Sequence, residues 1–145
     1  MARKSPSKNV FVLTLPLQCE AWQRDRLDTI FQVGNDIKNN LIAYERRQYQ
    51  NLISRKDWRA NQAALSAAYE AEDAGRIKAL CKRRNEMLTN AGFEQFQFEK
   101  QINKYRKHYR GKKGKGFLIP AHVAQKIAAS VWGGYQKLLY GRGQQ

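Results

Sequence analysis

The chain has 145 residues, of which 42% are hydrophobic and 11% aromatic, so it can bury a core and is not a disordered tail. Its 27 lysines and arginines against 12 acids give a net charge of +15, a self-repulsion that an anionic partner relieves. No stretch approaches the roughly 20 apolar residues of a membrane span, and Gln18 before Cys19 argues against a lipoprotein signal. These properties favour nucleic acid as the partner, with an anionic membrane surface as the alternative.

The charge is concentrated in the last third of the chain. All twelve acids lie between Glu20 and Glu99, and the first 99 residues carry +4 (16 cations against 12 acids). The 46 residues from Lys100 to Gln145 carry eleven cations and no acid, or +11. A polyanion site should therefore draw on this third. The two cysteines, Cys19 and Cys81, lack any metal-ligand spacing and are expected to be free thiols.

The chain opens with a basic arm and one expected strand. Met1–Lys8 forms the arm, and Asn9–Leu17 (NVFVLTLPL) has the β-branched, aromatic and leucine residues typical of a strand. Pro16 cannot donate a ladder hydrogen bond, so the strand ends there or lies at a sheet edge. We expect residues 1–18 to form an arm and a strand that needs partners, followed by a helical domain over residues 19–145.

Apolar residues at three- and four-residue steps predict helices in the remainder. Gly34, inside the first, is expected at a close helix–helix approach. The alternation Phe96-Gln97-Phe98 leaves a strand as the alternative within the fourth. The fold class is therefore mainly α, a bundle-like set of four to five helices with one N-terminal strand. The expected helices cover Glu20–Ser54, Asp57 to a stop at Gly75, Arg76 to a stop at Asn90-Ala91-Gly92, residues 93–110, and Ala121–Tyr140.

Enzymatic constellations are poorly represented. His108 and His122 do not fit a zinc-binding pattern, and the acids at 70, 72 and 73 are better explained as a solvated helix end than as a metal site. The stretch RGKKGKGFLIP (residues 110–120) has the glycine gap of a phosphate-binding loop, but Phe117 and Leu118 stand where Lys and Ser/Thr are required. We therefore expect no catalytic residue, no metal site and no cofactor.

The basic–aromatic run KQINKYRKHYRGKKGK (residues 100–115) is the strongest candidate for binding. Its lysines and arginines, which no acid balances, are suited to phosphate contacts. Tyr105 and Tyr109 could stack on bases, but a place in the core stripe of the helix is favoured. We expect residues 110–120 to form a basic connector that Phe117, Leu118 and Ile119 fix to the core. The predicted phosphate contacts are Lys104, Arg106, Lys107, Arg110, Lys112, Lys113, Lys115 and Lys126, with Arg3, Lys4 and Lys8 of the arm as secondary candidates.

Two stretches resemble the front part of TnpB-type RNA-guided nucleases, transposon-encoded relatives of type V CRISPR effectors. IFQVGNDIKNNLIAYERRQYQNL (Ile30–Leu52) is similar to an early helix of that family. The region Arg84–Gly143 is similar to a later part, where "RNE", an aromatic-rich helix, a basic run and an "AQKIA…VW" helix follow in order. FVLTLPL fits the opening strand, whereas Gly133-Gly134 departs from the family pattern.

The resemblance implies a wedge strand and a helical recognition domain without the nuclease. In this family the RuvC-like Asp/Glu/Asp site and the zinc ribbon follow the recognition domain, and we expect them to be missing here. The implied function is non-catalytic binding of guide RNA and target DNA, or of their heteroduplex, in a prokaryotic cytoplasm and away from membranes. The missing nuclease portion is a further implied partner. The alternatives are a stand-alone RNA- or DNA-binding regulator or RNA chaperone, and a protein bound to anionic lipid.

Overall fold

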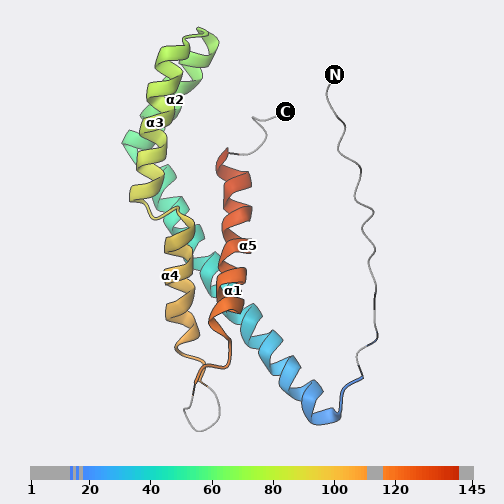
Figure 1. Cartoon of the computed structure of the whole chain (residues 1–145). Helices are drawn as coiled ribbons and strands as arrows, with labels where there is room; N and C mark the ends of the chain where they lie inside the picture. The colour runs from blue at the N-terminus through green and yellow to red at the C-terminus, as the bar shows by residue number, and fades with distance from the viewer. Residues whose placement is uncertain (1–13, 15, 17, 111–115, 141–145) are drawn as a thin grey trace, which may run out of the picture.

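A computed structural model describes residues 14, 16, 18–110 and 116–140, and this part of the chain is mainly helical (Figure 1). Three of the predicted spans are found with small changes at their ends, and the last one is found unchanged. Phe96-Gln97-Phe98 belongs to a helix, which excludes the strand alternative there. The helices of the described residues are α1 (Ala21–Ser54), α2 (Lys56–Glu70), α3 (Ala74–Asn90), α4 (Gln95–Arg106) and α5 (Ala121–Tyr140).

One sequence prediction, the N-terminal strand, lies mostly outside the described residues, and another, the helix stop at Gly75, is wrong. The predicted strand Asn9–Leu17 lies outside the described residues except for Thr14 and Pro16, neither of which is in a strand. The predicted helix stop at Gly75 is wrong, because α2 ends at Glu70 and Gly75 lies in the first turn of α3. Glu72 makes the turn with a positive φ of 52°, and the Asp73 carboxylate then accepts a hydrogen bond from the Arg76 amide at 3.0 Å. Asp73 is therefore a helix cap, whose side chain satisfies an otherwise unpaired amide.

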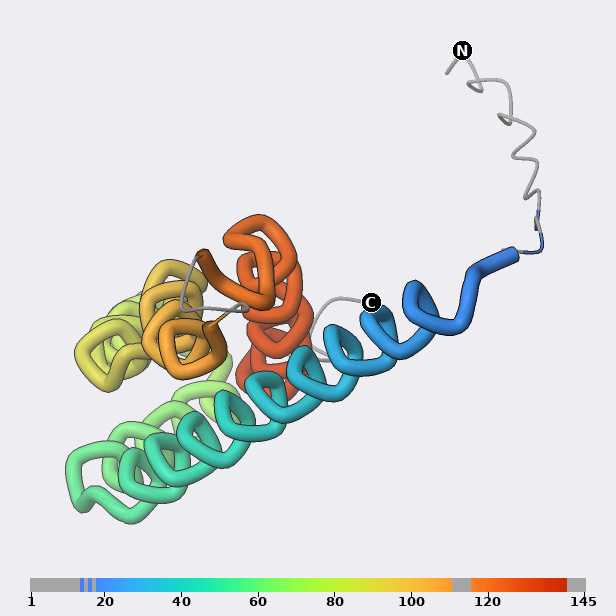
Figure 2. Tube along the Cα trace, turned by 90° about the horizontal axis from the view of Figure 1, so that it is seen from below, coloured from blue at the N-terminus to red at the C-terminus, as the bar shows by residue number. Residues whose placement is uncertain are grey.

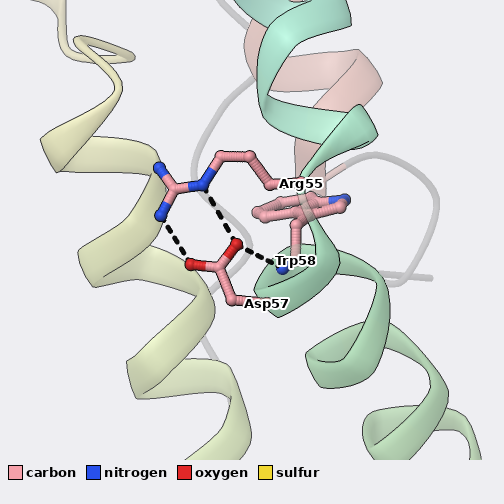
Figure 3. A network of polar contacts seen from close by, with 3 residues as sticks. All are labelled: Arg55, Asp57 and Trp58. Atoms are coloured by element: carbon pink, nitrogen blue, oxygen red, sulfur yellow. Dashed lines mark hydrogen bonds and ion pairs between the residues drawn. The ribbon is translucent and has the colours of Figure 1, made fainter.

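The α1–α2 junction is held by a polar contact at its surface (Figure 3). The Asp57 carboxylate accepts hydrogen bonds from Nε of Arg55 at 3.0 Å, from Nη2 of Arg55 at 2.5 Å and from the Trp58 amide at 2.9 Å. The Arg55 hydrogen bond is the main reason that the pKa of Asp57 lies below its ordinary value. Arg55 has an extended backbone conformation between the two helices, so its two hydrogen bonds to Asp57 lie at the point where the chain changes direction.

The α3–α4 turn follows a Schellman motif. Gly92 has a φ of 87°, and its amide donates to the Thr89 carbonyl, while the Phe93 amide donates to the Leu88 carbonyl, both at 3.0 Å. Glycine is favoured at the first position after such a helix because it adopts a positive φ without strain. Phe93 is then buried against the core. The predicted stop at Asn90-Ala91-Gly92 is confirmed.

The core lies where α1, α4 and α5 meet. Figure 2 shows α4 and α5 on the same side of α1, with the first turns of α1 continuing beyond both. Ile37 and Leu41 are fully buried at the centre of α1, whereas Phe31 is 65% exposed because it lies toward the projecting end. Part of the core is an aromatic cluster of edge-to-face and tilted rings, in which the buried Phe93 and Phe98 contact the half-buried Tyr49, Trp132 and Tyr135.

Gly34 faces α5, as the close-approach prediction requires, but the contact is not tight. A Cβ at Gly34 would lie 3.9 Å from Cδ1 of Ile127, which is an ordinary van der Waals distance. A methyl group therefore fits between the two helices at this point.

Gly133 and Gly134 lie inside α5, and a Cβ at either would meet no atom within 4 Å. Glycine in a helix interior costs about 1 kcal/mol relative to alanine because its unfolded state is more flexible. We expect the Gly133→Ala/Gly134→Ala double variant to raise the free energy of unfolding by about 1 to 2 kcal/mol in urea titrations. Gly92→Ala is the control and should destabilise, since its φ is positive. A double variant that unfolds at lower urea would contradict the open surroundings of these glycines.

Candidate nucleic-acid interface

One face of α4 carries a row of lysines. Lys100 and Lys104 lie in α4 and Lys107 is its C-cap residue with helical backbone angles, so steps of four and three residues place all three on one face, and all three are exposed. The opposite face buries Phe98 and Ile102 in the core. We call these three residues the lysine row. It extends over roughly 10 Å of helix axis, a length along which one nucleic-acid strand carries about three charges.

The chain after α4 closes a loop through a small antiparallel bridge. Arg110 pairs with Phe117, and the Leu118 amide donates to the Tyr109 carbonyl at 3.1 Å. The Arg110 guanidinium lies 5.3 Å from the centre of the Phe117 ring, which is a cation–π distance. The predicted basic connector therefore has its two ends joined, and Lys112, Lys113 and Lys115 lie between them, outside the described residues.

Arg106 has a structural role at the base of this loop. Its guanidinium stacks 4.3 Å from the centre of the Phe117 ring, and its Nη1 donates to the Ile119 carbonyl at 3.2 Å. Ile119 is fully buried and Leu118 packs against the core, so the predicted attachment of the segment is confirmed for these two residues. Phe117 is 38% exposed and contacts Arg106 and Arg110 instead. Arg106 therefore joins α4 to the segment before α5, and its predicted phosphate contact stays a prediction.

The other predicted phosphate contacts lie in different parts of the chain. Lys104 and Lys107 are brought together in the lysine row, and Arg110 is exposed beside the bridge. Lys126 is exposed on α5 and has no hydrogen bond to another described side chain. Arg3, Lys4 and Lys8 of the arm fall in the part of the chain that the structure does not describe. The structure adds Lys100, which the periodicity of α4 could have placed in the same row.

Few of the cations in the described part of the chain are in ion pairs. Among residues 18–110 and 116–140, the single ion pair joins Arg55 to Asp57. The lysine row therefore has no carboxylate partner at ion-pair distance in this part of the chain. Tyr105 and Tyr109, the aromatic residues of the basic run, are half-buried and pack against the core, which agrees with the core alternative.

A polar pocket of about 120 Å³ opens beside the lysine row, between α1, the α3–α4 turn and α4. Glu45 is the residue of this pocket that sequence reasoning missed. It is 2% exposed and accepts no hydrogen bond from any described residue, and burial raises its pKa from 4.5 to about 7. The signal was its position four residues after Leu41, on the buried face of α1. The lining residues are Tyr44, Glu45, Gln48, Ala91, Gly92, Gln97, Lys100, Gln101 and Lys104.

A second hollow, lined in part by Tyr49, lies between α1 and α5. It has a volume of about 430 Å³ and a mainly apolar lining that includes Ile42, Val131 and Leu138. Leu138 is 59% exposed and Lys38 and Arg46 flank the opening. Gly134 also lines this groove, and the absence of a side chain there helps to keep it open.

Neither a metal centre nor a membrane span is found in the residues that the structure covers. No three His, Cys, Asp or Glu side chains converge there, and the acids at 70, 72 and 73 form no such group. No helix among these residues is long and apolar enough to cross a membrane. No family model matches the chain, and it has no match among curated proteins or solved structures.

Proposed function

We propose that this chain binds nucleic acid without cleaving it, and that it holds the backbone of a guide RNA–target DNA heteroduplex. The observation that carries the proposal is the lysine row on α4, three exposed cations in register without an ion-pair partner among the described residues. Arg110 lies just beyond the row, and Lys112, Lys113 and Lys115 follow it in the sequence, outside the described residues. Cations in such numbers gain affinity by releasing counterions from phosphates.

The resemblance to the recognition part of TnpB-type nucleases supports the choice of heteroduplex. A protein that grips an A-form duplex by its backbone needs cations on a rigid surface and no base code. The helical body supplies that surface, because the residues opposite the lysine row are fully buried against α1 and α5. The chemistry of cleavage is assigned to no residue of this chain.

The salt dependence of binding tests the proposal. We expect the affinity for a 20-base-pair RNA–DNA hybrid, measured by fluorescence anisotropy, to fall between 50 and 300 mM KCl with a log–log slope of about −3 or steeper. Each phosphate contact contributes roughly −0.9 to this slope, so the three lysines of the row account for about −3. Contacts made by Lys112, Lys113, Lys115 and the arm would make the slope steeper. Incubation with Mg²⁺ should leave the hybrid intact. Binding that is independent of salt, or reproducible Mg²⁺-dependent cutting, contradicts the proposal.

The second candidate function is a stand-alone RNA- or DNA-binding regulator or RNA chaperone. It is favoured by the core, since α1, α4 and α5 bury their apolar faces against one another within the described residues. A structured RNA hairpin that binds at least as tightly as the hybrid at the same salt concentration would favour this alternative. Tighter binding of the hybrid favours the heteroduplex.

A further inference from the structure

We propose that the Glu45 pocket receives an unpaired guanine base of the bound nucleic acid while the lysine row holds the neighbouring phosphates. This inference rests on the proposed function and adds a base preference to it. The pocket and the row are contiguous, because Lys100 and Lys104 belong to both. A strand whose phosphates follow the row therefore passes the opening of the pocket.

The lining of the pocket selects for a nucleotide. The lining includes the carboxylate of Glu45, a buried residue that accepts no hydrogen bond from the described residues, an arrangement that is costly unless a ligand or water supplies N–H or O–H donors. It also includes two exposed lysines, Lys100 and Lys104, whose charge attracts an anion and repels a cationic ligand. A ligand that suits both kinds of group has hydrogen-bond donors on one edge and a negative charge on the other side, as a nucleotide does.

The size and the side walls are compatible with a planar polar group. The volume of about 120 Å³ is well above the roughly 15 Å³ that one water needs. Gln48, Gln97 and Gln101 of the lining supply amide donors and acceptors, and Tyr44 supplies an aromatic ring. Gly92 and Ala91 line one wall without a bulky side chain. Single-stranded bases are read in such surroundings through their Watson–Crick edges.

Guanine is the base that an ionised Glu45 fits best. Its Watson–Crick edge presents two adjacent donors, the N1 imino and N2 amino groups, so a carboxylate accepts from both. Adenine and cytosine place one amino donor beside a ring nitrogen whose lone pair repels a carboxylate. Uracil and thymine offer a single N–H between two carbonyls. The carboxylate must be ionised for this pairing, and the pKa near 7 makes the guanine preference grow as the pH rises from 6 to 8.

The titratable groups around Glu45 do not change the direction of this pH effect. Tyr44, Lys100 and Lys104 line the same pocket from α1 and α4. Tyr135 faces Glu45 from α5, and its pKa is raised by burial and by the charge of Glu45, with smaller influences of Arg46 and Tyr49. The raised pKa keeps the Tyr135 phenol neutral near pH 7. The pH effect is therefore assigned to Glu45, whose pKa is raised to about 7.

The test uses four RNA–DNA hybrids that differ in one unpaired RNA nucleotide, G, A, C or U, in competition anisotropy with the full chain at pH 8. We expect the unpaired-G hybrid to bind about 10-fold more tightly than the others. Glu45→Gln should abolish this preference, while its affinity for the other three hybrids and its salt slope stay at or above those of the wild type. Glu86→Gln, the same chemical change at an exposed position on α3, should keep the preference.

Two outcomes overturn the base pocket. One is equal binding of the four hybrids by the wild type, and the other is a guanine preference that survives Glu45→Gln. In either case, binding that still weakens steeply with salt leaves the proposed function standing. If no hybrid binds in a salt-dependent manner, the proposed function itself fails, so the two failures are distinguishable.

Discussion

Replacing Lys100, Lys104 and Lys107 together by glutamate is expected to weaken binding of an RNA–DNA hybrid by about 100-fold or more at 0.1 M salt. Each lost phosphate contact removes about 0.9 from the log–log salt slope, so the slope should become shallower by about 2 to 3. The effect is large because the three residues share one face of α4 and have no ion-pair partner within the described residues. Anisotropy titrations at four salt concentrations measure both quantities.

A matched control separates a local interface from the general effect of net charge. Arg76, Lys78 and Lys82 are exposed on α3, and their replacement by glutamate changes the net charge by the same amount. Arg76 lies in the first turn of α3, Lys78 in the second and Lys82 at mid-helix, so glutamates at these positions avoid the C-terminal end of the helix dipole and this variant should remain folded. We expect it to weaken binding much less than the α4 variant. Equal losses in the two variants would mean that net charge, and not the lysine row, determines affinity.

Helix dipole effects require one further variant, because two of the three lysines lie near the C-terminus of α4. Glutamates there are unfavourable by about 0.3 to 1 kcal/mol each. The neutral variant Lys100→Gln/Lys104→Gln/Lys107→Gln avoids this repulsion and should lose an intermediate part of the affinity. Thermal unfolding of both variants shows whether the loss of binding precedes any loss of structure.

The helices were predictable from the sequence because periodicity acts locally. Leu41 and Ile37 lie at a four-residue step and are fully buried, and α5 begins and ends at the predicted residues. The stop predicted at Gly75 is wrong because Glu72 makes the turn and Asp73 caps the next helix, although glycine is the residue that most often ends a helix. A non-glycine residue with a positive φ carries no signal in composition, so the turn could not be placed from the sequence alone.

The candidate site was predictable in part. The lysine row follows from the spacing of α4, but the role of Arg106 depends on Phe117 and Ile119, which are separated from it by the loop between α4 and α5. Such contacts between distant segments are set by tertiary packing, which sequence periodicity does not report. The same holds for the Glu45 pocket. Its walls come from α1, the α3–α4 turn and α4, and they meet only when these elements pack together.

Glu45→Gln is expected to stabilise the free protein at pH 8 by up to about 3 kcal/mol. Burial raises the pKa of Glu45 from 4.5 to about 7, so between these values the folded state holds a proton that the unfolded state has lost. The free energy of unfolding of the wild type therefore falls as the pH rises from 4.5 to 7, and the full cost of the buried charge is present above 7. Glutamine keeps the shape and removes the charge.

The pH dependence of the difference between variant and wild type identifies the cause. Urea titrations at pH 4.5, 6, 7 and 8 should give nearly equal stabilities at pH 4.5 and a growing advantage of Glu45→Gln up to about pH 7. Asp57 is the other acid among the described residues whose pKa is shifted, and because its pKa is lowered by Arg55, its contribution changes below this range. Glu86→Gln, at an exposed position, should show no such trend. A constant difference at all four pH values would mean that the carboxylate of Glu45 is already paired or solvated in the folded protein, and it would remove the buried charge on which the guanine pocket depends.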